Sequence, residues 1–320
     1  MNTVSPPSLI GNRYQLHETL GAGGMGIVYR AVDRQTEQNV AIKLLKPQAV
    51  SLAPDILERF AREAEALRQL DHPNIVKVFS TLQENDLHYL VMEYISGGSL
   101  QEVLQREGRM PINRILEIAL DLADALARAH RLRIIHRDIK PANVLIATDG
   151  STRLTDFGVA RMGTKERVTE IGSAVGTPDY MAPEALHGDE VDARADIWAL
   201  GVMLFEMLTG HRPFRGDNIT SMIVGVLTHP VPDLEALRPD APIPLIDLVY
   251  RMLTKDREAR IPSARLVGAE LEALASGTPV NAATYGTLRA TTMPSYTTST
   301  PPRTTPTPRH NLPAQTSTFI

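Results

Sequence analysis

A stretch of eight residues and a tripeptide that follows it constrain this chain more than any other feature. Residues 136–143 read HRDIKPAN and residues 156–158 read DFG. They place a carboxylate (Asp138), a lysine (Lys140) and an amide (Asn143) close together, and add a second carboxylate (Asp156) before a glycine. Phosphoryl transfer needs a group that orients a hydroxyl, a positive charge that neutralises the moving phosphate, and oxygen ligands for Mg²⁺. The stretch therefore predicts a phosphoryl-transfer site.

A glycine-rich segment, GAGGMG at residues 21–26, lies between two strand-like patterns at residues 14–20 and 29–32. A dinucleotide-binding loop is the main alternative, but that loop must open a helix. Here residues 27–29 are Ile-Val-Tyr, which favour a strand. We therefore expect a glycine hairpin between two strands, whose backbone N–H groups can bind phosphates, with a plain hairpin turn as the alternative.

Five motifs occur in the order found in the eukaryotic-like (Hanks-type) serine/threonine protein kinases. They are GAGGMG, VAIK at residues 40–43, HRDIKPAN, DFG, and APE at residues 182–184. The chain resembles this family over residues 14–276, and its GGMG and KPAN segments are most similar to bacterial members. The resemblance implies an α+β, bilobal fold with a small β-rich N-lobe, which has one main helix, and a larger, mostly helical C-lobe.

Lys43 stands at the end of an apolar strand, where a lysine is usually a solvated edge charge. The resemblance implies instead that Lys43 holds the α- and β-phosphates of ATP. Its partner is expected on a helix over residues 54–70, whose apolar residues have three-and-four spacing. Glu63 matches the family pattern and lies on the apolar side, where a carboxylate is costly unless paired. We predict a Glu63–Lys43 pair and interpret Glu58 and Glu65 as charges on the helix surface.

The resemblance also implies an ATP site built from the glycine loop, the strand of Lys43 and the connection between the lobes. Its expected residues are Leu20, Gly21, Ala22, Gly23, Gly24, Met25, Gly26, Val28, Ala41, Lys43, Met92, Glu93, Ile95 and Leu145. Met92 would lie behind the adenine. Backbone groups of Glu93 and Ile95 would pair with the adenine edge.

The catalytic loop supplies the remaining roles. Asp138 would orient the hydroxyl and accept its proton, which is worth roughly 10²–10⁴ in rate. Lys140 would stabilise the transferred phosphoryl group, and lysine here is typical of Ser/Thr rather than Tyr kinases. Asn143 and Asp156 would bind Mg²⁺, for which Mn²⁺ is an alternative. His136 is expected to be structural and to pack against the Phe of the DFG motif.

Regulation is expected in the segment from residue 156 to residue 184. Arg137 keeps its charge and needs an anion, which in such kinases is a phosphate on this segment. Thr169 best matches the position that bacterial relatives autophosphorylate, and Ser173 is second. Thr177 resembles the residue that contacts Asp138 and shapes the substrate site. A solvated loop residue is the alternative for each of these hydroxyls.

Two further acidic residues are expected to be structural. Glu184 has a candidate partner in Arg260, as in the buried pair of the family. Asp196 could be mistaken for a metal ligand, but a carboxylate at a helix N-terminus favours the helix dipole. In the family it braces the catalytic-loop backbone.

We predict an N-terminal extension over residues 1–13, a kinase domain over residues 14–276 (N-lobe 14–95, C-lobe 96–276) and a tail over residues 277–320. Further strands are expected at residues 75–79 and 87–94, and the segment from residue 230 to residue 244 is expected to be a loop. Helices are expected at residues 111–130, 196–209, 219–227, 244–253 and 263–275.

The tail is rich in Thr, Ser and Pro, and Arg289, Arg303 and Arg309 are its only charges. It cannot bury enough apolar surface to offset its chain entropy, so we expect it to be disordered. Its Thr-Pro pairs, at residues 300–301, 305–306 and 307–308, are candidates for autophosphorylation. A passive linker is the alternative.

Composition excludes several classes of protein. The chain has no cysteine, which rules out disulfides and zinc–thiolate sites. Its net charge of −4 gives no case for nucleic-acid binding. The N-terminus lacks the pattern of a secretory signal, and the most apolar run, residues 197–205, is too short for a membrane span of ~20 residues. We expect a cytoplasmic protein without a membrane segment.

The combined expectation is an ATP- and Mg²⁺-dependent, non-specific serine/threonine protein kinase of bacterial signal transduction, activated by autophosphorylation. Its partners would be protein substrates, and an N-lobe homodimer is a candidate assembly because family members often pair in that way. A pseudokinase scaffold is the first alternative, although it would not need all of Lys43, Asp138, Asn143 and Asp156. A small-molecule kinase is the second, and the complete activation segment counts against it.

Overall fold

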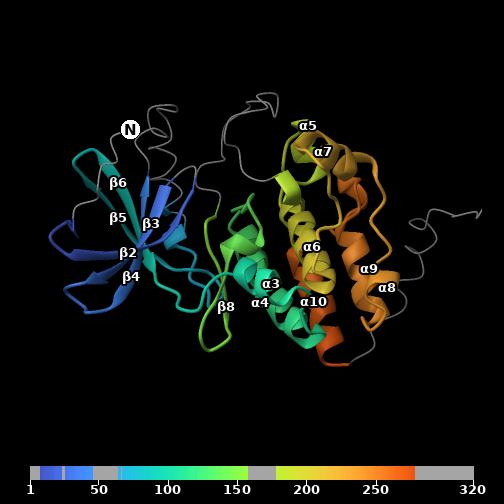
Figure 1. Cartoon of the computed structure of the whole chain (residues 1–320), viewed down its shortest axis with the longest axis horizontal. Helices are drawn as coiled ribbons and strands as arrows, with labels where there is room; N and C mark the ends of the chain where they lie inside the picture. Colours follow the sequence, from blue (N-terminus) through green and yellow to red (C-terminus); the bar gives the residue numbers. More distant parts are fainter. Residues whose placement is uncertain (1–7, 24–25, 46–63, 66, 158–177, 278–320) are drawn as a thin grey trace, which may run out of the picture. The chain divides into compact units, whose positions relative to one another are not determined.

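A computed structural model describes residues 8–23, 26–45, 64–65, 67–157 and 178–277 (Figure 1). Strands form the first part of this region and helices the second. We call residues 8–95 the N-lobe and residues 96–277 the C-lobe. The predicted α+β, bilobal fold is confirmed.

The N-lobe contains one antiparallel sheet of six strands in the order β1-β2-β3-β4-β6-β5. The strands are β1 (Leu9–Ile10), β2 (Tyr14–Ala22), β3 (Gly26–Asp33), β4 (Asn39–Leu45), β5 (Val78–Glu84) and β6 (Leu87–Glu93). Neighbouring strands place Lys43 opposite Val28 on one side and Leu90 on the other. This register fixes Lys43 in the middle of the sheet.

Two strands differ from the expectation. The short β1 was not predicted, yet Ile10 is fully buried and pairs with Tyr14. The strand predicted at residues 75–79 begins only at Val78. Ile75 instead forms an isolated bridge with Leu154 of the C-lobe, and the N–H of Val76 donates to the Leu154 carbonyl. The apolar pattern was correct, but part of it pairs outside the sheet.

The C-lobe is mostly helical. Its α-helices are α3 (Leu100–Glu107), α4 (Ile112–Arg131), α5 (Pro183–His187), α6 (Arg194–Thr209), α7 (Ile219–Thr228), α8 (Leu234–Leu237), α9 (Ile243–Met252) and α10 (Ala264–Ala275). A hairpin of β7 (Val144–Ile146) and β8 (Thr152–Leu154) follows the catalytic loop. The five predicted C-lobe helices agree with α4, α6, α7, α9 and α10 to within two residues at each end. The loop expected after residue 230 contains the short helix α8, which Asp233 caps.

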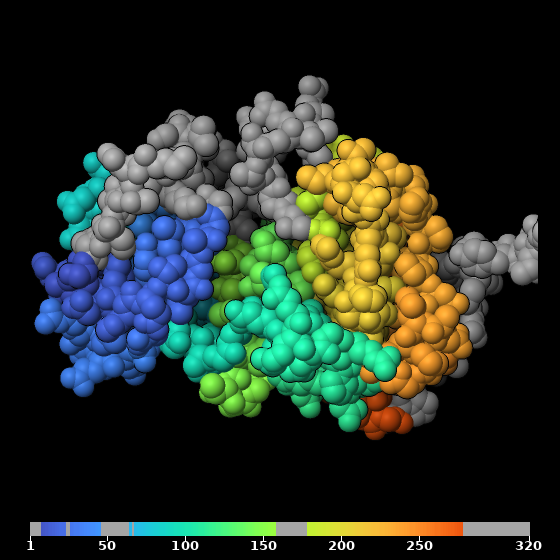
Figure 2. Space-filling model, viewed as in Figure 1, coloured from blue at the N-terminus to red at the C-terminus, as the bar shows by residue number. Residues whose placement is uncertain are grey.

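Helix α6 is the centre of the C-lobe core. Its residues are apolar on every side, and Trp198, Leu204 and Phe205 are almost completely buried. A helix that is hydrophobic all round must be covered on all sides. Both α4 and α9 pack against it, and α4 also packs along α10. In Figure 2 the end of α10 reaches the surface close to α4.

The segment between the lobes turns sharply at glycine. Gly97 has φ +130°, and a Cβ at this position would lie 2.2 Å from the Ile146 carbonyl oxygen. Only glycine avoids that collision. Ser99 then caps α3 and forms a capping box with Glu102. The connection is thereby held against β7, the strand that follows the catalytic loop.

Some expectations fall outside the described residues. Of the helix predicted at residues 54–70, the structure describes only its end, where residues 64–65 and 67–68 are helical. The tail beyond residue 277 is also outside. Within the described ranges, no helix combines the length and the apolar character that a membrane span requires.

Candidate active site

Two polar side chains of the catalytic loop donate hydrogen bonds to Asp138. The Lys140 Nζ donates to Asp138 Oδ2 at 2.8 Å. The Asn143 amide nitrogen donates to the same oxygen at 3.0 Å and to the Asp138 carbonyl at 2.8 Å. A 3₁₀ turn at Pro141–Asn143 brings Asn143 back toward Asp138. These hydrogen bonds hold the Asp138 side chain in place, and 23% of it remains exposed to solvent.

The carboxylate of Asp196, in the first turn of α6, holds the backbone of this loop. Its Oδ2 accepts from the His136 N–H and its Oδ1 from the Arg137 N–H, both at 2.8 Å. The Nε2 of His130, on α4, lies 2.8 Å from Oδ2. Arg137 has φ +64°, a conformation that costs a non-glycine residue roughly 1–2 kcal/mol. Asp196 thus fixes a strained loop that is adjacent to Asp138.

His136 is fully buried beside the site. Its Nδ1 accepts from the Asp138 N–H at 3.2 Å, so its Nε2 must carry the proton that it donates to the Thr155 carbonyl at 2.9 Å. Burial lowers the pKa of His136, although the nearby Asp196 carboxylate opposes the shift. The ring of Phe157 lies 4.5 Å from the His136 ring, measured between centroids. Neutral His136 therefore joins the catalytic loop to the DFG segment.

Lys43 of β4 reaches Asp156, which follows β8. The Nζ of Lys43 lies 2.6 Å from Asp156 Oδ1. Burial disfavours the charged form of Asp156, but Lys43 and other nearby groups together outweigh this effect and lower the pKa of the carboxyl. Lys140 contributes in the same direction. Sequence patterns did not predict this pair, because they matched Lys43 with Glu63, which lies outside the described residues.

The donor set near Asp138 fits a hard cation. Asp156 offers a carboxylate, and Asn143 uses its amide nitrogen toward Asp138, which directs the amide oxygen elsewhere. Mg²⁺ is typically held by one or two such groups together with substrate phosphates. Among the described residues there is no cluster of three His, Asp or Glu side chains that could hold a metal. Substrate phosphates and water would complete the coordination of a metal held by Asp156 and Asn143.

The apolar residues expected around adenine form one cluster. Ala41 and Met92 are buried, and Val28, Ile95 and Leu145 pack against them. Val76 belongs to the same cluster and was missed by the sequence analysis, since it stands in a segment that was expected to be a strand of the sheet. The N–H of Glu93 donates to the Lys77 carbonyl at 2.8 Å. This N–H group is therefore already hydrogen-bonded within the N-lobe.

The glycine loop joins β2 to β3. A Cβ at Gly21 or Gly23 would meet no atom of the described residues within 4 Å, which is consistent with room for a ligand. A Cβ at Gly26 would lie 2.5 Å from the Leu44 carbonyl oxygen, so this glycine is required by β4. Leu20 is exposed on β2, and Ala22 ends that strand. Gly24 and Met25 are outside the described residues.

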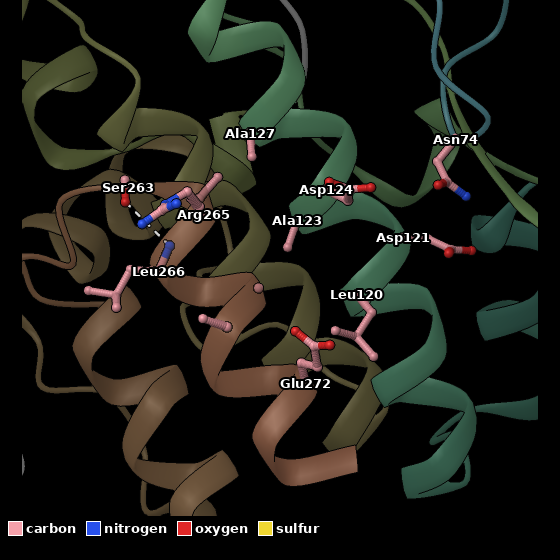
Figure 3. A pocket seen from close by; sticks show the side chains of 13 residues that line it. Asn74, Leu120, Asp121, Ala123, Asp124, Ala127, Ser263, Arg265, Leu266 and Glu272 are labelled. Carbon is pink, nitrogen blue, oxygen red and sulfur yellow. Dashed lines mark hydrogen bonds between the residues drawn. The ribbon is translucent and has the colours of Figure 1, made fainter. Parts of the chain in front are cut away.

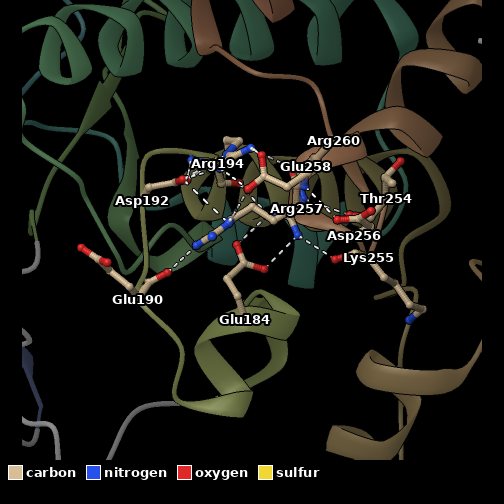
Figure 4. A network of polar contacts seen from close by, with 10 residues as sticks. All are labelled: Glu184, Glu190, Asp192, Arg194, Thr254, Lys255, Asp256, Arg257, Glu258 and Arg260. Carbon is tan, nitrogen blue, oxygen red and sulfur yellow. Dashed lines mark hydrogen bonds and ion pairs between the residues drawn. The ribbon is translucent and has the colours of Figure 1, made fainter.

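Glu184, in the first turn of α5, forms a buried ion pair with Arg260 (Figure 4). The two guanidinium nitrogens donate to the carboxylate at 2.7 and 2.9 Å. The other donors of Arg260 reach the carbonyls of Thr254, Arg194 and Lys255. All five donors of the guanidinium are therefore satisfied.

An exposed network surrounds this pair (Figure 4). Arg194 binds Asp192 at 2.8 Å and Glu258 at 2.9 Å, and Arg257 donates to the Glu190 carbonyl at 2.6 Å. The network joins the chain after α5 to the turn before α10. It therefore holds the end of the activation segment to the base of the C-lobe.

The structure does not describe six predicted residues, namely Gly24, Met25, Glu63, Thr169, Ser173 and Thr177. Besides the Lys43–Asp156 pair, it adds two contacts that sequence analysis missed. One is the His130–Asp196 contact described above. The other is the hydrogen bond that the Tyr180 hydroxyl donates to Glu206 Oε2 at 2.5 Å. Neither has a local signal, because a histidine or glutamate on a core helix gives no indication of its partner.

Comparison with known proteins gives consistent matches. A sequence profile of the protein kinase domain matches residues 14–270. Serine/threonine-protein kinase PknB of Mycobacterium leprae is 37% identical over 285 residues, which is 87% of this chain and 45% of the relative. PrkC of Bacillus subtilis is 35% identical over 263 residues, which is 82% of this chain and 40% of the relative. The chain thus spans less than half the length of these curated relatives.

Proposed function

Since this chain belongs to the protein kinase family, we propose that it transfers the γ-phosphate of ATP to serine and threonine hydroxyls of proteins. The observation that carries the proposal is the hydrogen-bonded group of Asp138, Lys140 and Asn143. Lys140 is also close enough to Asp156 to lower its pKa. The base, the cation and the metal ligands of a phosphoryl-transfer site are therefore neighbours.

Asp138 receives the acceptor hydroxyl. Two hydrogen bonds to its Oδ2 fix the orientation of the carboxylate, which would orient the hydroxyl and take its proton. The Nζ of Lys140 is held at 2.8 Å from Asp138 Oδ2. There its positive charge offsets the negative charge of the phosphoryl group during transfer. Lysine at this position and the names of the relatives favour serine and threonine as acceptors.

Other residues of the site bind the base, the phosphates and the metal. The apolar cluster of Ala41 and Met92 accommodates the base, and the space at Gly21 and Gly23 accommodates the phosphates. Lys43 holds the phosphates, and Asp156 and Asn143 hold the metal. When bound, Mg²⁺ neutralises phosphate charge and orients the γ-phosphoryl group.

Regulation by phosphorylation is part of the proposal. The guanidinium of Arg137 is permanently charged and stands next to Asp138. A phosphate on Thr169 or Ser173 would attract this guanidinium and order the substrate site through Thr177. We retain the division into a kinase domain over residues 14–276 and a tail, a cytoplasmic location where ATP is present, and an N-lobe homodimer as a candidate assembly.

The test is phosphorylation by the purified full chain with labelled ATP, Mg²⁺ and a generic protein substrate. Asp138→Asn should lower the rate by roughly 10²–10⁴ while nucleotide binding is unchanged. Asp86→Asn is the matched control, because Asp86 is exposed and its φ of +60° suits asparagine. Phosphosite mapping should place label on Thr169 or Ser173 in the active protein only.

The same experiment separates the enzyme from the scaffold. If the wild-type chain binds ATP but labels neither itself nor the protein substrate, the pseudokinase alternative replaces the proposal. If Asp138→Asn and Asp86→Asn are equally active, Asp138 is not the base.

A further inference from the structure

A groove of about 790 Å³ runs between α4 and α10 on the C-lobe (Figure 3). Small residues form its floor, among them Ala123 and Ala127 of α4 and Gly268 of α10. A Cβ built at Gly268 would lie 3.6 Å from the Ala123 Cβ, so the two helices are close and no large side chain fills the space above them. Ala123 itself is fully buried, whereas Ala127 and Gly268 are partly exposed and form the accessible, apolar part of the floor.

Charge is distributed unevenly along this groove. Asp121 and Asp124 of α4 and Glu272 of α10 lie along one part of it. Among the described residues that line it, Arg265 near the start of α10 is the only basic one (Figure 3). Asp121 and Asp124 are three residues apart and share a helix face. The groove therefore favours a cation.

The hydrogen bonds within the fold occupy only some of the acceptor oxygens of these carboxylates. Asp121 accepts one hydrogen bond, from the Thr152 N–H at 3.2 Å. Asp124 pairs with the His72 Nε2 at 3.1 Å, yet its side chain is 71% exposed. Glu272 is exposed and forms no ion pair with any residue of the described ranges. Their remaining oxygens are open to an incoming donor.

The dimensions suit a short extended peptide. The lining runs along α10 from Ser263 to Glu272, which at about 1.5 Å per residue is about 13 Å. An extended chain covers that distance with about four residues. An arginine in such a peptide can pack the aliphatic part of its side chain on the alanine and glycine floor. Its guanidinium can then donate to two carboxylates.

The chain contains a segment of matching charge. All 37 acidic residues lie within residues 1–277, together with 30 of the 33 lysines and arginines. Residues 278–320 contain three arginines and no Asp, Glu or Lys. Arg303 and Arg309 stand in the run TPPRTTPTPRH at residues 300–310. We propose that the α4–α10 groove binds this arginine-bearing segment of a second copy of the chain.

Binding is measured with a fluorescein-labelled synthetic peptide of residues 298–312, by anisotropy and without ATP, so the result is independent of the proposed kinase activity. The receptor is the full chain with Arg303→Ala and Arg309→Ala, which makes the peptide the sole source of these arginines. The groove variant adds Asp124→Asn and Glu272→Gln, and should raise the Kd by about tenfold. A second variant, Ala269→Trp, blocks the groove at an exposed position without changing charge, and should weaken binding similarly.

The matched control is Glu107→Gln with Glu117→Gln, which removes the same charge from exposed positions on α3 and α4 outside the groove. It should leave the Kd unchanged. An equal loss in this control would show nonspecific attraction and overturn the proposal. Unchanged binding in both groove variants, or equal binding of a peptide with both arginines replaced by glutamate, would also overturn it.

Sedimentation of the wild-type chain tests directly whether the groove binds the segment of a second copy. Self-association should rise with concentration and be lost both in Arg303→Ala/Arg309→Ala and in the groove variant. A wild-type chain that stays monomeric at all concentrations would overturn the second copy as the occupant.

Discussion

At the scale of single residues, strain is located beside the reacting groups. Arg137 and Asp156 have φ of +64° and +56°, in the region that favours glycine. Each such residue costs roughly 1–2 kcal/mol unless its surroundings fix it. Asp196 holds the N–H of Arg137, and Lys43 holds the carboxylate of Asp156. The neighbours of these residues therefore determine the geometry of the site.

Arg260→Lys should destabilise the protein although it preserves the charge. A lysine cannot reproduce the two bonds to Glu184 together with the three bonds to backbone carbonyls. The buried Glu184 would lose its partner, and breaking such a pair costs about 3–5 kcal/mol. Urea unfolding measures the change in free energy. The exposed Arg106→Lys is the control and should change little. A loss below about 1 kcal/mol for Arg260→Lys would show that the guanidinium geometry is dispensable.

His136 should make stability depend on pH. Burial lowers its pKa below the 6.5 of an unfolded histidine. Below about pH 7 the unfolded chain thus binds more protons, so stability falls as pH falls through 6.5 and levels off below the folded pKa. His136→Phe should therefore flatten the fall in unfolding free energy between pH 7.5 and 5.5. The exposed His229→Asn should keep the wild-type slope. Equal slopes in all three proteins would contradict this assignment.

At the scale of elements, two helical glycines should respond oppositely to alanine. A Cβ at Gly201 of α6 would lie 2.9 Å from the Met252 Cβ of α9, so Gly201→Ala must separate these helices. Overpacking costs about 1–3 kcal/mol, against up to about 1 kcal/mol gained in helix propensity. Gly268→Ala of α10 meets the Ala123 Cβ at an ordinary 3.6 Å and should stabilise by about 0.5 kcal/mol. Thermal unfolding of both variants checks the sign, and the same sign for both would refute the packing argument.

Long periodic elements could be predicted from the sequence, and short ones could not. The apolar spacing of α4 and the continuous apolar run of α6 gave boundaries within two residues. The two-residue β1 has no period to detect, and α8 is a single turn within a proline-rich segment. At Ile75 the residue type was right, but its partner Leu154 is distant in sequence.

In the site, too, local sequence predicted some contacts and not others. Asp138, Lys140 and Asn143 are neighbours in the sequence, and the structure brings them together. Partners supplied by other elements could not be predicted, because a side chain gives no local sign of what it meets. His130 of α4 contacts Asp196 of α6, and Lys43 meets Asp156, which is 113 residues away.

At the scale of the whole molecule, the site depends on contacts between the lobes. Lys43 belongs to the N-lobe sheet, while Asp156 follows the β7–β8 hairpin of the C-lobe. Leu90 and Ile75 of the N-lobe join the same hydrophobic core as Leu154. A ligand that binds both sides of this contact should therefore stabilise the folded domain as one unit.

A non-hydrolysable ATP analogue with Mg²⁺ should consequently raise the melting temperature. At 100 times the Kd the gain is about 2.7 kcal/mol, or about 5–10 °C for a domain of this size. Asp156→Asn should lose the part of the shift that requires Mg²⁺ and keep the part due to the analogue alone, because the carboxylate is lost while the apolar cluster around Ala41 remains. Differential scanning calorimetry with and without Mg²⁺ measures both parts. Asp86→Asn should behave as wild type. If Asp156→Asn keeps the full Mg²⁺ increment, another side chain holds the metal.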